Sequence, residues 1–415
     1  MRKSGPMMLV AIPLLVLVGC GSGEPTSTQD LLFLRTSRGV AVVSTGGAAP
    51  TLRTAAIPAG DWSSVVRARQ TGSSTRLTAL NPLSGAGLWG RTLEGNFEVK
   101  VVSEDAQMVA LGPVGEGYYF VGRRGGARLA RKHTKLVIIK RSVARPQTIR
   151  LKGNYEPEAF STDGDALFVL KYSPARAPTH YQVRHLNLRT ERVGGVYTVD
   201  GDLQESMRGT ARVQAMSPDG NRLYTLYTLG RGDSRRAFVH VLSLDEQWAH
   251  CIDLPARFGT ADESSTVLTV SPDGGRLYVA DASTRAVAEI DTAALRVARS
   301  STIDFGGGSP AYAASDENDT LYLASDRRVV AVDATTLVER DSWESGEVGE
   351  RITGIQIGSE STRLYVGFNR RIAVLDALSG KLLRTLDPPG VVRIQQLGRV
   401  MRSLDEERTS FTCAC

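Results

Sequence analysis

The chain is organised around one short turn that recurs with almost the same letters. Residues 271–280 read SPDGGRLYVA, and residues 217–224 repeat the pattern as SPDGNRLY. The proline presets φ, the aspartate can hydrogen-bond its own backbone, and glycine accepts the positive φ that a tight turn requires. The apolar side chains that follow alternate as they do along a strand. The pattern predicts β-hairpins, and it constrains the fold more than any other feature of the sequence.

Weaker copies of this turn extend the series in both directions, at residues 103–109, 161–168, 315–322 and 359–365. An aromatic residue follows five of the turns, at separations of 56, 54, 44 and 43 residues: Phe168, Tyr224, Tyr278, Tyr322 and Tyr365. A period of this size with several strands per repeat is typical of a β-propeller built from four-stranded antiparallel blades. The alternative is a set of convergent Asp-Gly turns in another all-β fold, which the five matching aromatic positions argue against.

The two ends of the repeat series predict how the ring closes. Residues 31–43 form a hairpin with no inner strand before it, and residues 391–397 form one further strand with no partner. Joining them completes a blade and removes an open sheet edge. We therefore expect eight blades within a propeller domain of residues 31–400, followed by a tail of residues 401–415. Seven blades remain the alternative if the first hairpin is only a decoration.

The N-terminus has the form of a targeting segment. Arg2 and Lys3 precede an apolar run over residues 7–18, which is short for a membrane-spanning helix. Residues 17–20, Leu-Val-Gly-Cys, resemble the lipobox of bacterial lipoproteins. That resemblance implies a signal peptide of residues 1–19, acylation of Cys20 and a polar tether of residues 20–30. The protein is then expected on the extracytoplasmic side of a cell membrane. The alternatives are an ordinary secretory signal and an uncleaved anchor.

Two further stretches resemble known propeller repeats. Residues 79–89 (ALNPLSGAGLW) resemble the PQQ-type repeat, in which a tryptophan docks between blades, but the matching stretch 374–384 ends in Arg384. The resemblance covers one blade, so it implies the fold and no quinone cofactor. Residues 277–280 (LYVA) and 287–291 (VAEID) resemble YVTN-type and cytochrome-like surface-protein propellers. Members of those families bind proteins, act on lactones or have no known activity.

Few residues have the spacing of a catalytic or metal site. His180 and His185 share a predicted strand, but their odd spacing places them on opposite faces. If residues 244–247 form a hairpin turn, His240 lies directly across from Cys251, and a histidine beside a thiol can activate it as a nucleophile. A chance cross-strand pair is the preferred interpretation. We predict no catalytic, cofactor-binding or metal-binding residue, and we expect Cys251 to stay reduced, with Cys413 and Cys415 bridged locally or free.

Charge is distributed unevenly along the chain. Residues 117–155 contain no acidic residue and eleven basic ones, which are Arg123, Arg124, Arg128, Arg131, Lys132, Lys135, Lys140, Arg141, Arg145, Arg150 and Lys152. The net charge is +6, so without Arg2 and Lys3 the chain carries +4 and everything outside this segment carries −7. Such a segment beside a membrane tether suggests contact with anionic lipid headgroups or a phosphate-bearing envelope polymer.

The candidate contact residues are Arg123, Arg124, Arg128, Arg131 and Lys132. A solvated loop is the alternative, and nucleic acid is not an expected partner of an exported protein. Taken together, the sequence predicts a membrane-anchored lipoprotein propeller that acts as a non-catalytic binding or assembly scaffold in the envelope, with an envelope protein as partner. One version of this role is that of the lipid-anchored, eight-bladed scaffold of outer-membrane protein assembly. The alternative is a propeller-type lactonase or lyase with its site at the central channel, which acids or histidines at the funnel-facing ends of inner strands would favour.

Overall fold

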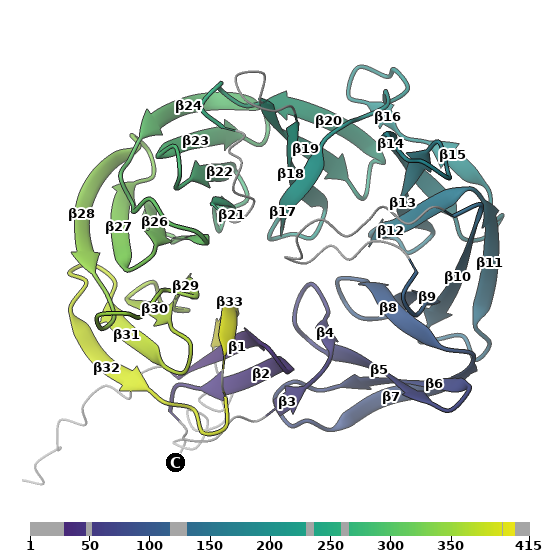
Figure 1. The fold of residues 1–415 in the computed structure, drawn as a ribbon, viewed down its shortest axis with the longest axis horizontal. Coiled ribbons are helices and arrows are strands. Elements are labelled where there is room, and N and C mark those ends of the chain that lie inside the picture. The colour runs from purple at the N-terminus through teal and green to yellow at the C-terminus, as the bar shows by residue number, and fades with distance from the viewer. Residues whose placement is uncertain are drawn as a thin grey trace, which may run out of the picture.

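The computed structural model describes residues 29–46, 52–116, 131–229, 236–258, 265–391 and 393–402. Within these residues the fold consists of strands alone, arranged as eight antiparallel sheets around a central channel (Figure 1). The prediction of an eight-bladed β-propeller is therefore confirmed, and the seven-bladed alternative is wrong. No helix in the described part of the chain has the length and apolar character needed to cross a membrane.

Each blade has an inner strand beside the channel, two middle strands and an outer strand at the rim. The inner strands are β4 (Ile57–Pro58), β8 (Phe97–Val102), β12 (Asn154–Phe160), β17 (Thr210–Met216), β21 (Thr266–Val270), β25 (Ala311–Ser315), β29 (Gly354–Ile357) and β33 (Ile394–Arg402). The second strands are β5 (Val65–Thr71), β9 (Met108–Pro113), β13 (Ala166–Ser173), β18 (Arg222–Leu229), β22 (Arg276–Asp281), β26 (Thr320–Ser325), β30 (Arg363–Gly367) and β1 (Asp30–Thr36).

The third strands are β6 (Ser74–Leu80), β10 (His133–Lys140), β14 (His180–Asn187), β19 (Arg236–Ser243), β23 (Ala286–Asp291), β27 (Arg328–Asp333), β31 (Ile372–Asp376) and β2 (Gly39–Ser44). The outer strands are β7 (Gly87–Glu94), β11 (Gln147–Lys152), β15 (Val193–Gly195), β20 (Trp248–Asp253), β24 (Arg296–Thr302), β28 (Val338–Glu344), β32 (Leu382–Leu386) and β3 (Leu52–Thr54). A fifth strand, β16 (Tyr197–Thr198), runs parallel to β20. We number the blades in chain order, with β33-β1-β2-β3 as the first or closing blade.

The ring closes as the sequence predicts. Strand β33 from the C-terminal end pairs antiparallel with β1 from the N-terminal end, so that Leu397 lies opposite Leu34 and Ile394 opposite Thr36. Figure 1 shows the yellow β33 beside the purple β1 at the inner edge of the closing blade. Both faces of β1 are buried: Leu32 and Leu34 pack toward the eighth blade, and Leu31 and Phe33 toward the second. This two-sided burial explains the continuous apolar run in that strand.

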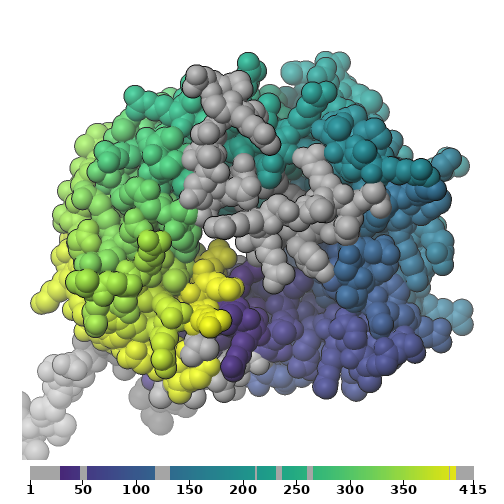
Figure 2. All heavy atoms as spheres, viewed as in Figure 1, coloured from purple at the N-terminus to yellow at the C-terminus, as the bar shows by residue number. Residues whose placement is uncertain are grey.

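Every seam between neighbouring blades has its own apolar cluster. Eight such clusters are present, one for each pair of adjacent blades around the ring. A blade therefore buries its two faces only against its neighbours, as expected for a closed repeat fold. The space-filling view shows the blades packed side by side around a face that is hollowed at the centre of the ring (Figure 2).

The recurring turns connect inner to second strands and define one face of the ring, which we call the turn face. In the fifth blade the hydroxyl of Ser217 donates to Asp219, and the Asp219 carboxylate accepts the backbone N–H of Asn221. Gly220 sits at φ 73°, the conformation for which glycine is favoured. The opposite face, which we call the loop face, carries the connections between second and third strands and between successive blades.

Candidate functional site

Charged side chains gather on the inner strands of the third and fourth blades. The Lys100 ammonium on β8 lies 2.7 Å from Glu98 and 3.5 Å from Glu156 of β12, and Glu156 also pairs with Arg131 at 2.8 Å. The Arg131 guanidinium donates to the side chain of Asn154 as well. These four ionisable side chains are 2–16% exposed, so they form one chain of buried ion pairs with no net charge. Such a chain costs desolvation free energy and is stable only while every member keeps its partner.

Backbone irregularities accompany these charges. The register between inner and second strands shifts by one residue at Lys100 in the third blade, at Glu158 in the fourth and at Arg212 in the fifth. The corresponding pairs in the sixth, seventh and eighth blades have no shift. A bulge leaves one residue unpaired and re-aims its side chain. The bulges in the third and fourth blades therefore each place an ionisable residue, Lys100 or Glu158, three positions before the serine of the following turn.

Glu158 begins a buried polar cluster between the fourth and fifth blades. Its carboxyl accepts a hydrogen bond from Gln214 at 3.4 Å, and the second carboxyl oxygen is buried without a hydrogen-bond partner among the described residues. Burial raises the pKa of Glu158 to about 8, so the carboxyl group is mostly protonated at neutral pH. The rings of Tyr181 and Tyr227 stack nearby with centroids 5.4 Å apart, and burial raises the pKa of both hydroxyls.

The predicted register of His240 and Cys251 is confirmed, because the two residues lie directly opposite on β19 and β20. They do not form an activated nucleophile. A nitrogen of the His240 ring is 2.7 Å from the side-chain nitrogen of Gln204, and burial, with a smaller contribution from His250, lowers the pKa of His240 to about 4. Burial of the sulfur and the nearby Asp253 raise the pKa of Cys251 to about 12, although the residue as a whole is exposed. A neutral imidazole and a protonated thiol give no thiolate at neutral pH.

The two histidines of β14 do not form a joint site. His180 and His185 lie on β14, where the alternation of side chains places them on opposite faces. His180 contacts the hydroxyl of Thr179, and His185 contacts the backbone carbonyl of Gly195 at 2.8 Å. Over the part of the chain that the structure describes, no three histidine, cysteine, aspartate or glutamate side chains form a group able to hold a metal ion.

The structure separates the candidate anion-contact residues. Arg131 is 8% exposed in its ion pair with Glu156, so its guanidinium is engaged inside the ring, whereas Lys132 is exposed. Arg123, Arg124 and Arg128 lie outside the described residues, as do Cys20, Cys413 and Cys415. Strand β9 ends at Pro113 and β10 begins at His133 on the loop face. The chain thus leaves and re-enters the third blade on the loop face. Asp30, at which the first strand starts, lies on the opposite face.

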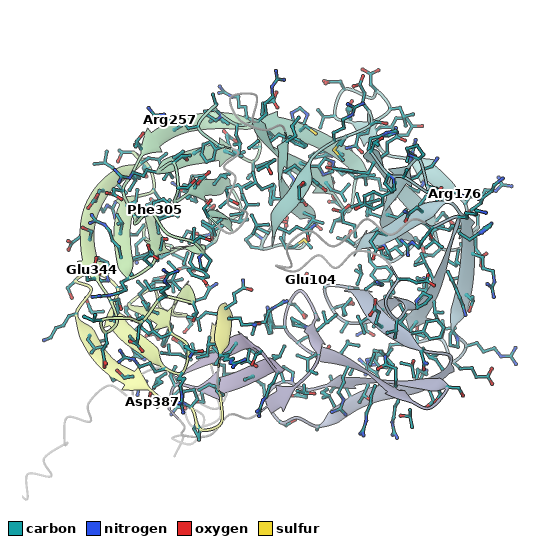
Figure 3. All side chains as sticks on the ribbon, in the orientation of Figure 1. Glu104, Arg176, Arg257, Phe305, Glu344 and Asp387 are labelled. Carbon is teal, nitrogen blue, oxygen red and sulfur yellow. The ribbon has the colours of Figure 1, made fainter. Side chains whose placement is uncertain are left out.

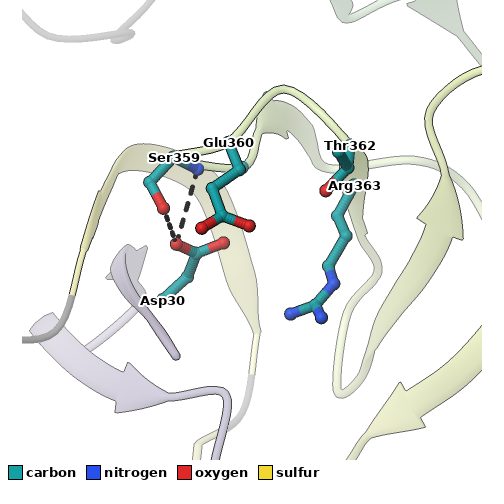
Figure 4. Close-up of a pocket in the computed structure, with 6 residues that line it drawn as sticks. Asp30, Ser359, Glu360, Thr362 and Arg363 are labelled. Carbon is teal, nitrogen blue, oxygen red and sulfur yellow. Dashed lines mark hydrogen bonds between the residues drawn. The ribbon is translucent and has the colours of Figure 1, made fainter. Parts of the chain in front are cut away.

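The turn face has two features of its own. Glu104 lies beside the channel in the turn between β8 and β9 (Figure 3). At the seam between the eighth and closing blades, a shallow surface depression is lined by Asp30, Gly358, Ser359, Glu360, Thr362 and Arg363 (Figure 4). The Asp30 carboxylate accepts hydrogen bonds from Ser359 and, at 2.6 Å, from the hydroxyl of Tyr365. These hydrogen bonds between side chains hold the eighth blade and the closing blade together.

Sequence reasoning missed the buried ion pairs. Glu98 and Lys100 alternate with valines along β8, which is also the pattern of a strand with one solvent-exposed face. The proline in β12 and the two glutamates that flank it are the available signal, because proline in an inner strand indicates a bulge. Which acid pairs with which base depends on the neighbouring blade, and a single strand does not contain that information.

No protein-family model matches the chain, and no curated protein matches it. Solved structures do. The structure of apo AztD from Citrobacter koseri has a TM-score of 0.55 at 13% identity, over 88% of this chain and 97% of that one. A second AztD structure from Citrobacter koseri has a TM-score of 0.52 at 12% identity, over 88% and 96%. BamB from Moraxella catarrhalis has a TM-score of 0.46 at 12% identity, over 81% and 88%. At these identities the AztD likeness shows the β-propeller fold and nothing beyond it.

Proposed function

We propose that the protein is an exported lipoprotein, held at a membrane through acylated Cys20, whose propeller is a non-catalytic binding or assembly scaffold of the cell envelope. One observation carries the proposal: the strand that follows the tether, β1, is a middle strand of the closing blade and starts on the turn face. The tether is thus joined to a strand that is paired on both sides, with β2 and with β33. The loop face, on which β9 ends and β10 begins, is left to meet a partner.

Topology also favours one of the two predicted anionic partners. The ends of the basic segment lie on the loop face, away from the face on which the tether enters the ring. The ten residue-to-residue steps from Cys20 to Asp30 span at most about 35 Å when fully extended. A partner that extends from the envelope, such as a phosphate-bearing polymer or an acidic protein, fits this placement better than the lipid headgroups around the anchor. Arg131 is not a member of this contact set, because Glu156 holds it.

The ion pairs support binding over catalysis. Acids do occur on the inner strands, which by itself would favour a lactonase or lyase. However, Glu98 and Glu156 are paired with Lys100 and Arg131, so neither is available as a general base in this arrangement. Glu158 is protonated at neutral pH and faces Gln214. These side chains hold two blades together, which is the work of a scaffold.

The anchor is tested by fractionation. Replacing the acylated thiol (Cys20→Ala) is expected to release the protein from the membrane fraction or to block its maturation. The measurement is membrane fractionation together with metabolic lipid labelling. A variant that stays with the membranes and still carries a lipid label would show that Cys20 is not the anchor.

The binding face is tested by charge removal. Changing Arg123, Arg124, Arg128 and Lys132 to serine is expected to abolish capture of envelope components in a pull-down from solubilised envelopes and to abolish retention on polyphosphate-coated beads. Both should weaken as salt rises, because exposed charges are screened beyond about 8 Å at physiological ionic strength. The matched control changes four exposed arginines elsewhere to serine: Arg69, Arg76, Arg189 and Arg296. Equal loss in both variants would indicate a general charge effect and contradict a site on the loop face.

A further inference from the structure

An exposed apolar corner lies on the turn face of the eighth blade. Leu378 is 88% exposed in the turn between β31 and β32, and Leu382 and Leu383 at the start of β32 are 54% and 51% exposed. The register shift between β31 and β32 leaves Leu383 without a residue opposite. Three exposed leucines within six residues give this corner an apolar surface of the kind that marks an interaction site.

This corner is joined by direct contacts to the point where the tether enters the ring. The backbone N–H of Ala377, next to Leu378, donates to the carbonyl of Thr362 at 3.0 Å. Thr362 belongs to the same turn as Ser359, which bonds the Asp30 carboxylate (Figure 4). Two neighbouring turns of one blade therefore separate Leu378 from the first strand residue after the tether.

We infer that this corner, formed by Leu378, Leu382 and Leu383, docks on the lipid bilayer to which the chain is tethered. The inference rests on the proposed acylation of Cys20. With about 35 Å of extended chain at most between that residue and Asp30, the bilayer is the apolar phase always within reach of the corner. Leucine side chains enter the boundary between headgroups and acyl chains, while the exposed Lys381 and Arg384 beside them can keep their charges in the headgroup layer.

Docking at this corner fixes the orientation of the ring. The turn face at the eighth and closing blades lies against the membrane, and the loop face points away from it. A second, equally exposed apolar side chain provides the internal comparison. Val348, 92% exposed, lies between β28 and β29 on the loop face, at the entry to the same blade. The orientation predicts lipid contact for Leu378 and none for Val348.

The experiment uses the mature chain with a hexahistidine tag in place of Cys20, bound to nickel-chelating vesicles of phosphatidylcholine and phosphatidylglycerol. Leu378→Trp and Val348→Trp each add one fluorophore, and the emission of the native tryptophans is subtracted. Brominated lipids are expected to quench about half of the emission added at position 378, as for a residue in the interfacial layer, and none of that added at 348. Leu382→Trp is the second reporter if the melting temperature of Leu378→Trp differs from the parent's.

The outcomes separate this inference from the proposed anchor. Because the chelate replaces the acyl group, absence of lipid on Cys20 shows only in the fractionation experiment, and absence of docking shows only here. Equal quenching at both positions, quenching at 348 alone, or none at 378 and 382 would each overturn the inference. Changing all three leucines to serine should raise the mobility of the anchored ring, measured as faster fluorescence anisotropy decay, and no change would also contradict docking.

Discussion

The sixth to eighth blades and the third to fifth blades use different contacts to join neighbours. In the first group, a tyrosine of the second strand donates its hydroxyl to the next blade: Tyr278 to the Ala334 carbonyl, at 3.3 Å, and Tyr322 to the Ala377 carbonyl, at 3.1 Å. Their inner strands β21, β25 and β29 contain no charged residue and no bulge. In the second group, the inner strands carry bulges, buried ion pairs and the polar cluster around Glu158.

This difference shows that the contacts between neighbouring blades can vary while the closed ring of blades is kept. Neutral hydrogen bonds to backbone carbonyls tolerate change, because a carbonyl is present whatever side chain the position has. Buried ion pairs do not, because each charge is costly without its partner. The regular half therefore acts as the frame, and the charged half holds side chains in fixed positions next to the channel. Irregularities in a repeat protein concentrate where function is expected.

At the junction with the closing blade, the regular pattern is adapted to the chain ends. Tyr365 repeats the position of Tyr278 and Tyr322, but its hydroxyl donates to the Asp30 carboxylate in place of a backbone carbonyl. The same carboxylate accepts from Ser359, and the Asp30 backbone N–H donates to Thr45. One acidic side chain at the start of β1 thus joins the closing blade to the eighth blade.

The largest expected effect comes from opening the ring, on which both halves depend. Truncation after Gly390 removes β33, the inner strand of the closing blade, and exposes the edge of β1 along its whole length. We expect loss of the cooperative melting transition and aggregation, measured by calorimetry and light scattering. The control is truncation after Arg402, which keeps β33 and is expected to melt like the full chain. An unchanged melt after the first truncation would show that β33 does not hold the ring.

The second effect separates the two halves. Glu156→Ala removes the carboxylate between Arg131 and Lys100, and breaking a buried ion pair costs about 3–5 kcal/mol. The comparison in the regular half is Tyr322→Phe, which removes one neutral hydrogen bond worth about 0.5–1.5 kcal/mol. Denaturant unfolding measures both free energies. Equal losses would mean that the two kinds of seam are energetically equivalent, contrary to the comparison.

The smallest effect is the pH dependence contributed by Glu158 in the charged half. The folded-state pKa of Glu158 is about 8 and the ordinary value 4.5, so between these values the native state binds more protons than the unfolded state. Stability due to this residue therefore falls as pH rises from 4.5 to 8 and is constant above. Glu158→Gln should remove that slope.

The measurement for Glu158 is the free energy of unfolding at a series of pH values in wild type and variant. The matched control is Glu317→Gln, at an exposed turn of the regular half, which should keep the wild-type slope. Identical slopes for wild type and Glu158→Gln would show that the carboxyl group is not buried as described.

The recurring hairpins of both halves were predictable because their information is local. Turn residues set the backbone of each hairpin directly, and strand alternation repeats at a fixed period, so residues 217–224 and 271–280 suffice to predict blades. The weaker turns follow the same geometry with other residues. Ala106, Asp319 and Ser361 have φ of 54–55° where the clear copies have glycine. Their copies were recognisable only because the stronger ones gave the period.

What the sequence by itself determined is the strand order, the ring and its closure, because an unpaired hairpin at one end and an unpaired strand at the other have one economical solution. It also placed His240 across from Cys251. The tertiary structure alone decided that Arg131 pairs with Glu156, that the Glu158 carboxyl group is buried, and that β9 ends and β10 begins on the face opposite to Asp30. These depend on contacts between blades. Arg131 and Glu156, for example, are 25 residues apart in the sequence. Desolvation and charge pairing act through space, and only the closed ring fixes which side chains share a seam.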